Sequence, residues 1–141
     1  SALLPMGGAV SGVAGPNWLL IGDAAACVNP LNGEGIDYGL ETGRLAASML
    51  GAPDLAAAWP ALLADHYARG FSVARRLGLL LTLPRFLPLT GPVAMRSRRL
   101  MGLAVRVMGN LVTDEDADWV AKVWRSAGYG SRILDRRKPF S

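Results

Sequence analysis

Apolar and small residues recur at helical spacing in the part of the chain that follows a glycine-rich stretch. They are Ile36, Leu40, Gly43, Ala47 and Leu50. Steps of three and four residues place them on one face of an α-helix. Gly51 is a suitable C-terminal cap, and Pro53 prevents continuation. The pattern predicts a helix over residues 36–50.

Two stretches of the following segment are also typical of helices. Asp54 is favoured at an N-cap, and the residues after it carry apolar and aromatic side chains as far as Tyr67. Pro60 lies too deep for a first-turn residue, so we expect an irregular first turn or a kink there. Residues 71–89 are mainly Leu, Phe and Val with three Arg, and they predict a helix to about Leu83 before two prolines break the chain.

Two more helices are predicted near the C-terminus. One is expected to begin after residues 91–92 and to run to Gly109, with an apolar stripe opposite its Arg residues. Residues 113–116 (Thr-Asp-Glu-Asp) are typical of a helix start, because the Thr hydroxyl and the acids suit the N-terminal end of the helix dipole. That helix is expected to end near Ala127, and residues 132–141 to be loosely held.

Short apolar runs near the N-terminus predict strands. Residues 17–21 form such a run between turn residues, which is typical of a buried strand. Residues 2–6 resemble a short strand or the end of one. The glycines and Pro16 between these runs predict loops and turns.

Composition bounds the class of protein. The 141 residues, 51% of them hydrophobic, suffice for one domain with a core and are too apolar for intrinsic disorder. The single cysteine, Cys27, excludes a disulfide framework and a multi-cysteine metal site. Nothing basic lies near it in sequence, so we expect a small buried thiol. The chain has no initiator Met or signal-peptide pattern, and we expect a piece of a longer protein.

Charge is unevenly divided between the two halves of the chain. Residues 1–66 hold one base and six acids, whereas residues 67–141 hold fourteen bases and five acids. A basic half favours an anionic partner, either nucleic acid or a membrane surface. The Arg residues interleave with Leu and Met, and no nucleic-acid motif is present, so no nucleic acid is expected. We expect residues 71–89 to contact a membrane or to form the wall of a lipid tunnel. Residues 71–108 are expected to mediate contact with lipid, with seven arginines at the lipid surface: Arg75, Arg76, Arg85, Arg96, Arg98, Arg99 and Arg106.

One group of residues in the sequence is suited to binding a ligand. A strand is followed by Gly22 and Asp23, then by small residues, Pro30 and a Gly33-Glu34-Gly35 turn that leads into the predicted helix. A carboxylate at a strand end can accept hydrogen bonds from hydroxyl groups, and glycines allow close backbone approach. The helix N-terminus offers unpaired N–H groups and partial positive charge to an electron-rich oxygen.

The stretch WLLIGDAAACVNPLNGEGIDYGLETGRLAA resembles the second FAD-binding motif of the para-hydroxybenzoate-hydroxylase-type flavoproteins, and most closely their geranylgeranyl-reductase branch. The matching residues are Gly22, Asp23, Ala24, Ala25, Pro30, Gly33, Glu34, Gly35, Ile36, Gly43, Ala46 and Ala47. Ala26 departs, because that branch often has Gly there. The match covers residues 17–50 well and the remainder only loosely.

The resemblance implies a role for each matching position. Asp23 would accept a hydrogen bond from the ribityl chain of FAD, and Pro30 would shape the loop beside the isoalloxazine. The backbone N–H groups of Gly35, Ile36 and Asp37 would point at the flavin pyrimidine edge, where the helix dipole stabilises the negative charge of reduced flavin. Gly22 and Gly33 complete the cofactor-binding set by their place in the motif.

Two departures bear on this resemblance. Aromatic monooxygenases of the same superfamily often carry His and Asn where this chain has Ala26 and Asp37, which favours the reductase branch. The G-x-G-x-x-G unit that holds the ADP half of FAD does not occur in these 141 residues. We therefore expect the chain alone to be inactive and to depend on an N-terminal remainder of the same protein.

The resemblance implies an α/β parent with a Rossmann-like FAD-binding fold. Residues 1–50 would be a remnant of the FAD-domain sheet, and residues 51–141 a mainly α-helical C-terminal region. The expected activity is FAD-dependent saturation of carbon–carbon double bonds in a polyprenyl lipid, such as a geranylgeranyl group, an archaeal-type lipid or the side chain of menaquinone. The basic half favours menaquinone and a cytoplasmic protein that is peripheral at the cytoplasmic membrane. The alternatives are an aromatic monooxygenase and a non-catalytic helical membrane-binding module.

Overall fold

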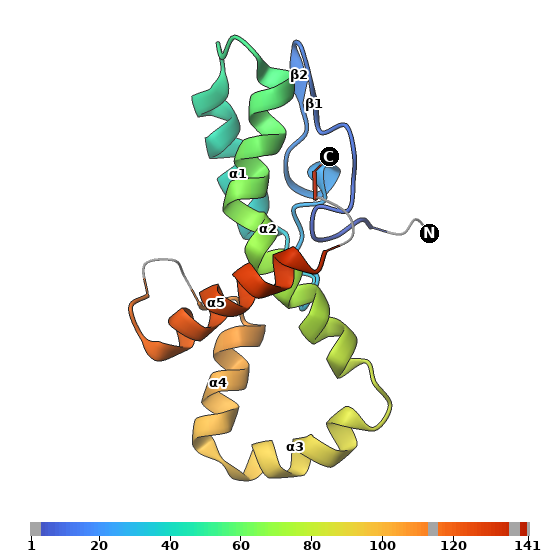
Figure 1. Cartoon of the computed structure of the whole chain (residues 1–141), viewed down its shortest axis with the longest axis vertical. Helices are drawn as coiled ribbons and strands as arrows, with labels where there is room; N and C mark the ends of the chain where they lie inside the picture. The colour runs from blue at the N-terminus through green and yellow to red at the C-terminus, as the bar shows by residue number, and fades with distance from the viewer. Residues whose placement is uncertain (1–3, 113–115, 136–138, 141) are drawn as a thin grey trace.

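The chain is mainly helical, with one small sheet (Figure 1). The computed structural model describes residues 4–112, 116–135 and 139–140. Within these ranges, two short strands and a 3-10 turn precede five helices. In chain order the elements are β1 (Ala14–Gly15), β2 (Trp18–Leu19), η1 (Gly22–Ala25), α1 (Ile36–Met49), α2 (Leu55–Leu81), α3 (Phe86–Arg96), α4 (Arg98–Met108) and α5 (Trp119–Ile133).

The strands form an antiparallel hairpin around a two-residue turn at Pro16 and Asn17. Ala14 pairs with Leu19, and Gly15 pairs with Trp18. The prediction of a buried strand over residues 17–21 is wrong in extent and in burial, because Trp18 and Ile21 are exposed. Within the described residues β2 pairs with β1 alone. Residues 4–6 form no strand, and residues 1–3 lie outside the described chain.

Helices α1 and α2 begin and end largely where the residue pattern predicted. Gly51, just after α1, has the left-handed φ of +91° that favours glycine. The Asp54 carboxylate accepts a hydrogen bond of 3.0 Å from the Ala57 N–H and caps α2. The two helical stretches predicted after Asp54 form one helix, which continues without interruption through Pro60.

The single helix predicted from after residues 91–92 to Gly109 is wrong at its start, because this part of the chain forms two helices, α3 and α4, which are separated at Ser97. Gly91 and Pro92 lie inside α3. Pro88 is tolerated as the third residue of α3, since the first N–H groups of a helix have no intrahelical partner. Ser97 adopts an extended conformation, and its hydroxyl accepts a hydrogen bond from the Leu100 N–H. This cap starts α4.

Helix α5 begins at Trp119 behind Asp118, whose carboxylate accepts from the Ala121 N–H at 3.0 Å. Of the start predicted at residues 113–116, residues 113–115 lie outside the described residues, and Asp116 precedes the helix. The helix continues to Ile133, beyond the predicted end at Ala127. The expectation of a loosely held tail is wrong for its described end, because Phe140 is buried and its N–H donates to the Gly8 carbonyl at 3.0 Å.

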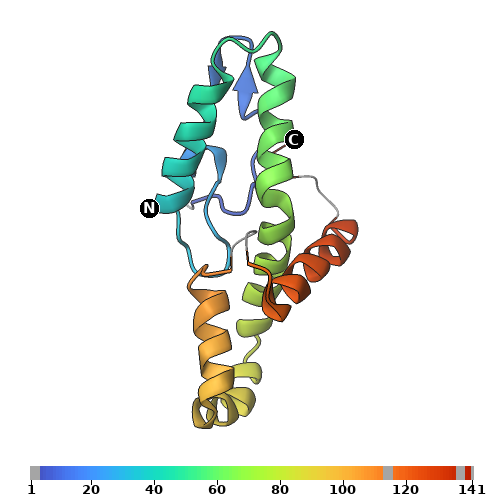
Figure 2. The ribbon, with the colours of Figure 1, turned by 90° about the vertical axis from the view of Figure 1, so that its left-hand side faces the viewer.

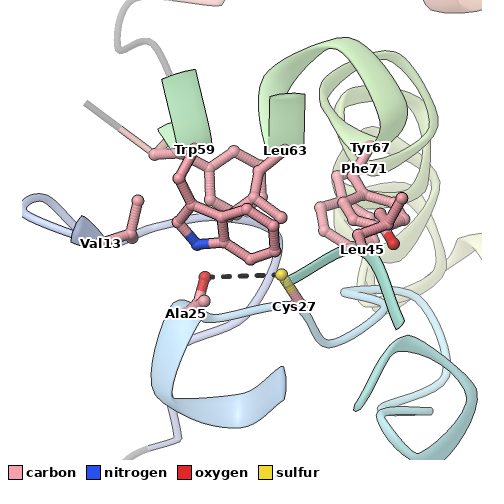
Figure 3. Packing of buried hydrophobic residues seen from close by; sticks show 9 residues of the cluster. Val13, Ala25, Cys27, Leu45, Trp59, Leu63, Tyr67 and Phe71 are labelled. Carbon is pink, nitrogen blue, oxygen red and sulfur yellow. Dashed lines mark hydrogen bonds between the residues drawn. The ribbon is translucent and has the colours of Figure 1, made fainter. Parts of the chain in front are cut away.

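The hydrophobic core lies between the N-terminal loops, α1 and the first half of α2 (Figure 3). The Trp59 indole N–H donates to the Leu20 carbonyl at 2.9 Å and thereby joins α2 to the hairpin region. The core draws on both sides of the predicted boundary at residue 50. Its members are Val13, Ala25, Cys27, Leu45, Trp59, Leu63, Tyr67, Phe71 and Phe140.

The second half of α2 extends beyond this core (Figures 1 and 2). Helix α5 crosses this half of α2, and α3 connects its end to α4, which runs opposite. Helix α5 crosses α2 through small residues, with the hydroxyls of Ser72 and Ser131 2.6 Å apart. None of the described helices is by itself long and apolar enough to cross a membrane. Together α2 and α3 reach that length and hydropathy, but they are bent by 103° at their junction.

Candidate functional site

The Gly22–Asp23 turn is held against the first half of α1. Gly22 has φ of +52°, and a Cβ there would lie 3.3 Å from Cα of Gly39, so this close backbone approach requires glycine. The Gly22 N–H donates to Oγ1 of Thr42 at 3.0 Å. That hydroxyl in turn donates to the Tyr38 carbonyl at 2.6 Å. These contacts fix the turn to the helix that follows the motif.

The Asp23 carboxylate lies at the N-terminus of α1. A Cβ built on Gly35, the N-cap of that helix, would lie 2.9 Å from Oδ1 of Asp23 and 3.3 Å from Cγ2 of Val28. Asp23 is exposed, and its carboxylate forms no hydrogen bond or ion pair with the rest of the described chain. The site therefore combines a free carboxylate acceptor with the partially positive end of a helix.

The first N–H groups of α1 differ in availability. The Asp37 N–H donates to Oε1 of Glu34 at 2.8 Å. For the N–H groups of Gly35 and Ile36, the described residues provide no acceptor, and the Ile36 side chain is 80% exposed. Two of the three donors expected to face a ligand are thus open, and the third is held by Glu34. The sequence did not reveal this capping role of Glu34, whose other carboxylate oxygen is buried without a described partner.

The loop before α1 is closed by its own backbone. Gly33 has φ of +76°, and its N–H donates to the Asn29 carbonyl at 2.8 Å, while the Asn29 N–H donates to the Glu34 carbonyl at 2.8 Å. Pro30 lies against α2, since a Cβ on Gly78 would lie 3.2 Å from the Pro30 carbonyl oxygen. Pro30 thus joins the loop to the second half of α2.

The end of α4 is tied to the same loop, a feature that the sequence analysis missed. Oδ1 of Asn110 accepts hydrogen bonds from Nδ2 of Asn29 at 3.3 Å and from the Tyr38 hydroxyl at 3.1 Å. Nδ2 of Asn32 donates to the Met108 carbonyl at 2.7 Å. The Gly-Asn pair at 109–110, typical of a helix C-terminus, was the available signal. Burial raises the pKa of Tyr38 to about 12, so its hydroxyl remains a donor.

Cys27 is a buried thiol, as predicted. Its Sγ lies 3.8 Å from the Ala25 carbonyl, to which it donates. Burial, and then the negative charges of Asp23 and Glu41, raise the pKa of the thiol to about 12. Such a group is not a reactive thiolate at neutral pH. Across the described ranges, no three His, Cys, Asp or Glu side chains are grouped to hold a metal ion.

An apolar cavity of about 990 Å³ lies between the second half of α2 and helices α3, α4 and α5. Its walls are Leu, Val, Met, Ala, Phe and Trp side chains, with Leu31 of the loop at one point. Thr90 carries the one hydroxyl among the described lining residues, and it donates to the Phe86 carbonyl at 2.7 Å. We call this space the α2–α5 cavity.

Three of the seven arginines expected at a lipid surface form ion pairs with aspartates of the described chain. Arg75 and Arg76 pair with Asp135 at 3.0 and 3.4 Å, and Arg76 also donates to Oγ of Ser131 at 2.6 Å. Arg106 pairs with two aspartates that precede α5. These pairs fix α5 to α2 and α4.

The other four arginines are exposed and have no acidic partner among the described residues. They flank α3 and begin α4, and we call residues 85–99 the basic elbow. Exposed apolar side chains, including Leu89 and Met95, lie among them. The four are Arg85, Arg96, Arg98 and Arg99.

The chain is closely similar to curated proteins named menaquinone reductase. It is 78% identical to one from Mycolicibacterium smegmatis (strain ATCC 700084 / mc(2)155) over 144 residues, and 77% identical to one from Mycobacterium tuberculosis (strain ATCC 25618 / H37Rv) over 141 residues. All of this chain is covered, but it spans only 35% of the length of either relative. No family model and no solved structure matches the chain.

Proposed function

We propose that this chain is part of a longer FAD-dependent reductase that saturates carbon–carbon double bonds in a polyprenyl chain. One observation carries the proposal: the free Asp23 carboxylate lies against Gly35 at the N-terminus of α1, where a Cβ would crowd it. The name of the relatives supports a reductase and favours menaquinone as the substrate. That the polyprenyl side chain is the part reduced follows from the resemblance of the motif to the geranylgeranyl-reductase branch.

The residues at this site suit the flavin half of FAD. Asp23 would accept a hydrogen bond from a ribityl hydroxyl, and the open N–H groups of Gly35 and Ile36 would donate to the pyrimidine edge. Glu34 would keep the turn rigid by holding the Asp37 N–H. The ADP half of the cofactor would be held by a part of the protein outside this chain.

The chemistry of the proposed reaction divides between cofactor and chain. When bound and reduced, FAD would supply the hydride that adds to one alkene carbon and would itself be oxidised, and a proton would be added at the neighbouring carbon. The chain would orient the flavin through Asp23, and the dipole of α1 would favour negative charge on the reduced ring. No described residue is assigned as the proton donor.

A peripheral position at the cytoplasmic membrane is the second part of the proposal. The basic elbow combines four unpaired arginines with exposed apolar side chains of α3, which is the composition of an interfacial segment. Arginines near an anionic bilayer each contribute about 1 kcal/mol of binding. A menaquinone-like substrate resides in such a bilayer, so the elbow would bring the protein to it.

The test is an oxygen-free reaction of the longer protein, reduced with dithionite and mixed with a quinone that carries an unsaturated polyprenyl chain. A reductase is expected to purify with flavin and to saturate the chain without oxygen. An aromatic monooxygenase would form product only after oxygen is admitted. A non-catalytic membrane module would contain no flavin, and either of these last two results would refute the proposal.

A further inference from the structure

We infer that the α2–α5 cavity holds the polyprenyl tail of the substrate, extended from the basic elbow toward the Pro30–Gly35 loop. This inference rests on the proposed function, and it assigns the substrate tail to a particular part of the chain. It is carried by the chemistry of the cavity walls, by their contact with the loop, and by the openness of the cavity at the elbow.

The walls of the cavity select an apolar occupant. The Thr90 hydroxyl is already bonded to the Phe86 carbonyl, so it offers no unsatisfied donor to a ligand. The other described lining side chains are aliphatic, thioether or aromatic, and no charged residue lines the cavity. A volume of about 990 Å³ lies at the upper end of the roughly 300–1,000 Å³ of ligand pockets. These features suit a long hydrocarbon chain.

One end of the cavity adjoins the proposed flavin loop. Leu31 lines the cavity, and its neighbour Pro30 lies against α2 at Gly78. The hydrogen bond from Asn32 to the Met108 carbonyl fixes the cavity wall of α4 to the same loop. A hydrocarbon chain in the cavity would therefore be directed toward the loop that precedes α1, which hydride transfer from the flavin requires.

The cavity is open to the exterior along α3, and also at α5, where Trp119 and Val123 line it and are more than half exposed. Leu87, Leu89, Val93 and Met95 all line it, yet each remains more than half exposed. The arginines of the elbow flank these side chains and would lie at the headgroup level of an anionic bilayer. The lipid tail could then pass from the bilayer into the cavity while the protein remains at the surface.

The experiment uses the longer protein bound to anionic vesicles that contain a diazirine-bearing geranylgeraniol. After irradiation, labelled peptides are identified by mass spectrometry. We expect labels on the lining of α2–α5, and their loss when unlabelled geranylgeraniol competes. Ala94→Trp and Ala104→Trp place bulk in the cavity and are expected to reduce labelling by roughly tenfold or more. Ala61→Trp, at an exposed position in the first half of α2, is the control and should not reduce it.

Flavin content and helix content, measured on the same samples, separate the possible outcomes. Reduced labelling with normal flavin and helix content would support the inference. Labels elsewhere, or labelling that both cavity variants leave unchanged, would overturn it while the flavin proposal stands. Absence of labels from α2–α5 would overturn it too, as expected if another segment of the longer protein fills the cavity. A longer protein without flavin would refute the proposed function, and the inference with it.

Discussion

A Cβ on Gly35 would lie 2.9 Å from Oδ1 of Asp23, so the carboxylate of the η1 turn and the N-terminus of α1 meet where a side chain would crowd them. Asp23 precedes Gly35 by twelve residues, and the intervening loop is closed by hydrogen bonds within residues 29–34. The carboxylate remains exposed and free of described partners. The carboxylate of Asp23, an acceptor, therefore lies close to the open N–H donors of Gly35 and Ile36.

Asp23→Ala in the longer protein is expected to weaken flavin retention. A charge-assisted hydrogen bond contributes about 1.5–3 kcal/mol, which corresponds to roughly 10- to 150-fold in affinity. Flavin per polypeptide after gel filtration measures the effect. Asp65→Ala removes another exposed carboxylate, one whose only described ion pair is with Arg69 on the same helix, and should leave the flavin content unchanged. Wild-type affinity in the Asp23 variant would refute the assignment.

Gly35→Ala is expected to reduce flavin content while helix content stays near that of the wild type. The new Cβ would crowd the Asp23 carboxylate, but φ of −135° at this position is accessible to any residue, so the backbone itself is not strained. Circular dichroism and the flavin absorption spectrum report the two quantities. Gly70→Ala, where a Cβ meets nothing within 4 Å, is the matched control. Equal flavin content in both variants would mean that Gly35 serves only the turn.

Removal of two elbow charges is expected to weaken binding to anionic vesicles. Arg98→Gln with Arg99→Gln should lower the bound fraction in a sedimentation assay, and the loss should shrink at high salt because exposed charges are screened. Arg44→Gln with Arg132→Gln removes the same charge from exposed positions outside the elbow and should have little effect. Equal loss in both double variants would show that net charge, rather than the elbow, binds the membrane.

Cys27 is expected to resist thiol reagents in the folded chain. A pKa raised from 9.0 to about 12 leaves about a thousandfold less thiolate at pH 8, and burial further restricts access. Labelling with a chromogenic disulfide should be slow in buffer and rapid in denaturant. Fast labelling of the folded chain would contradict the buried placement of this residue.

Asp135→Ala is expected to destabilise the chain by about 1–3 kcal/mol, because it leaves Arg75 and Arg76 without their shared carboxylate. The midpoint of chemical unfolding, followed by circular dichroism, measures this change. Asp54→Ala removes a surface cap and should cost only about 1 kcal/mol. An unchanged midpoint in Asp135→Ala would show that the ion pairs of Asp135 with Arg75 and Arg76 do not stabilise the fold.

Local signals in the sequence predicted much of the secondary structure. The helical spacing of apolar residues over 36–50 and the capping residues Gly51 and Asp54 correctly predicted α1 and the start of α2. Such signals are local, because caps and helical periods act over a few residues. The break at Ser97 was missed, since the prolines of α3 are stronger breakers in general than a serine cap. The sequence analysis overestimated the free-energy cost of a proline at position 88, because Pro88 lies in the first turn of α3.

The sequence motif also placed the candidate site residues near one another, but it could not reveal their long-range partners. Asn110 reaches Asn29 and Tyr38 across slightly more than half of the chain, and Asp135 pairs with two arginines that the pattern assigned to lipid. Such pairs depend on how α4 and α5 pack on α2. No local period or spacing encodes that packing.

The most direct test of the account is the mass of the lipid product after a single oxygen-free turnover of the longer, dithionite-reduced protein with menaquinone that carries a fully unsaturated side chain. The account requires the side chain to gain two hydrogens while the flavin is reoxidised, and it requires Asp23→Ala to diminish both changes together. Unchanged side-chain mass, with the flavin bound and reduced, would contradict it.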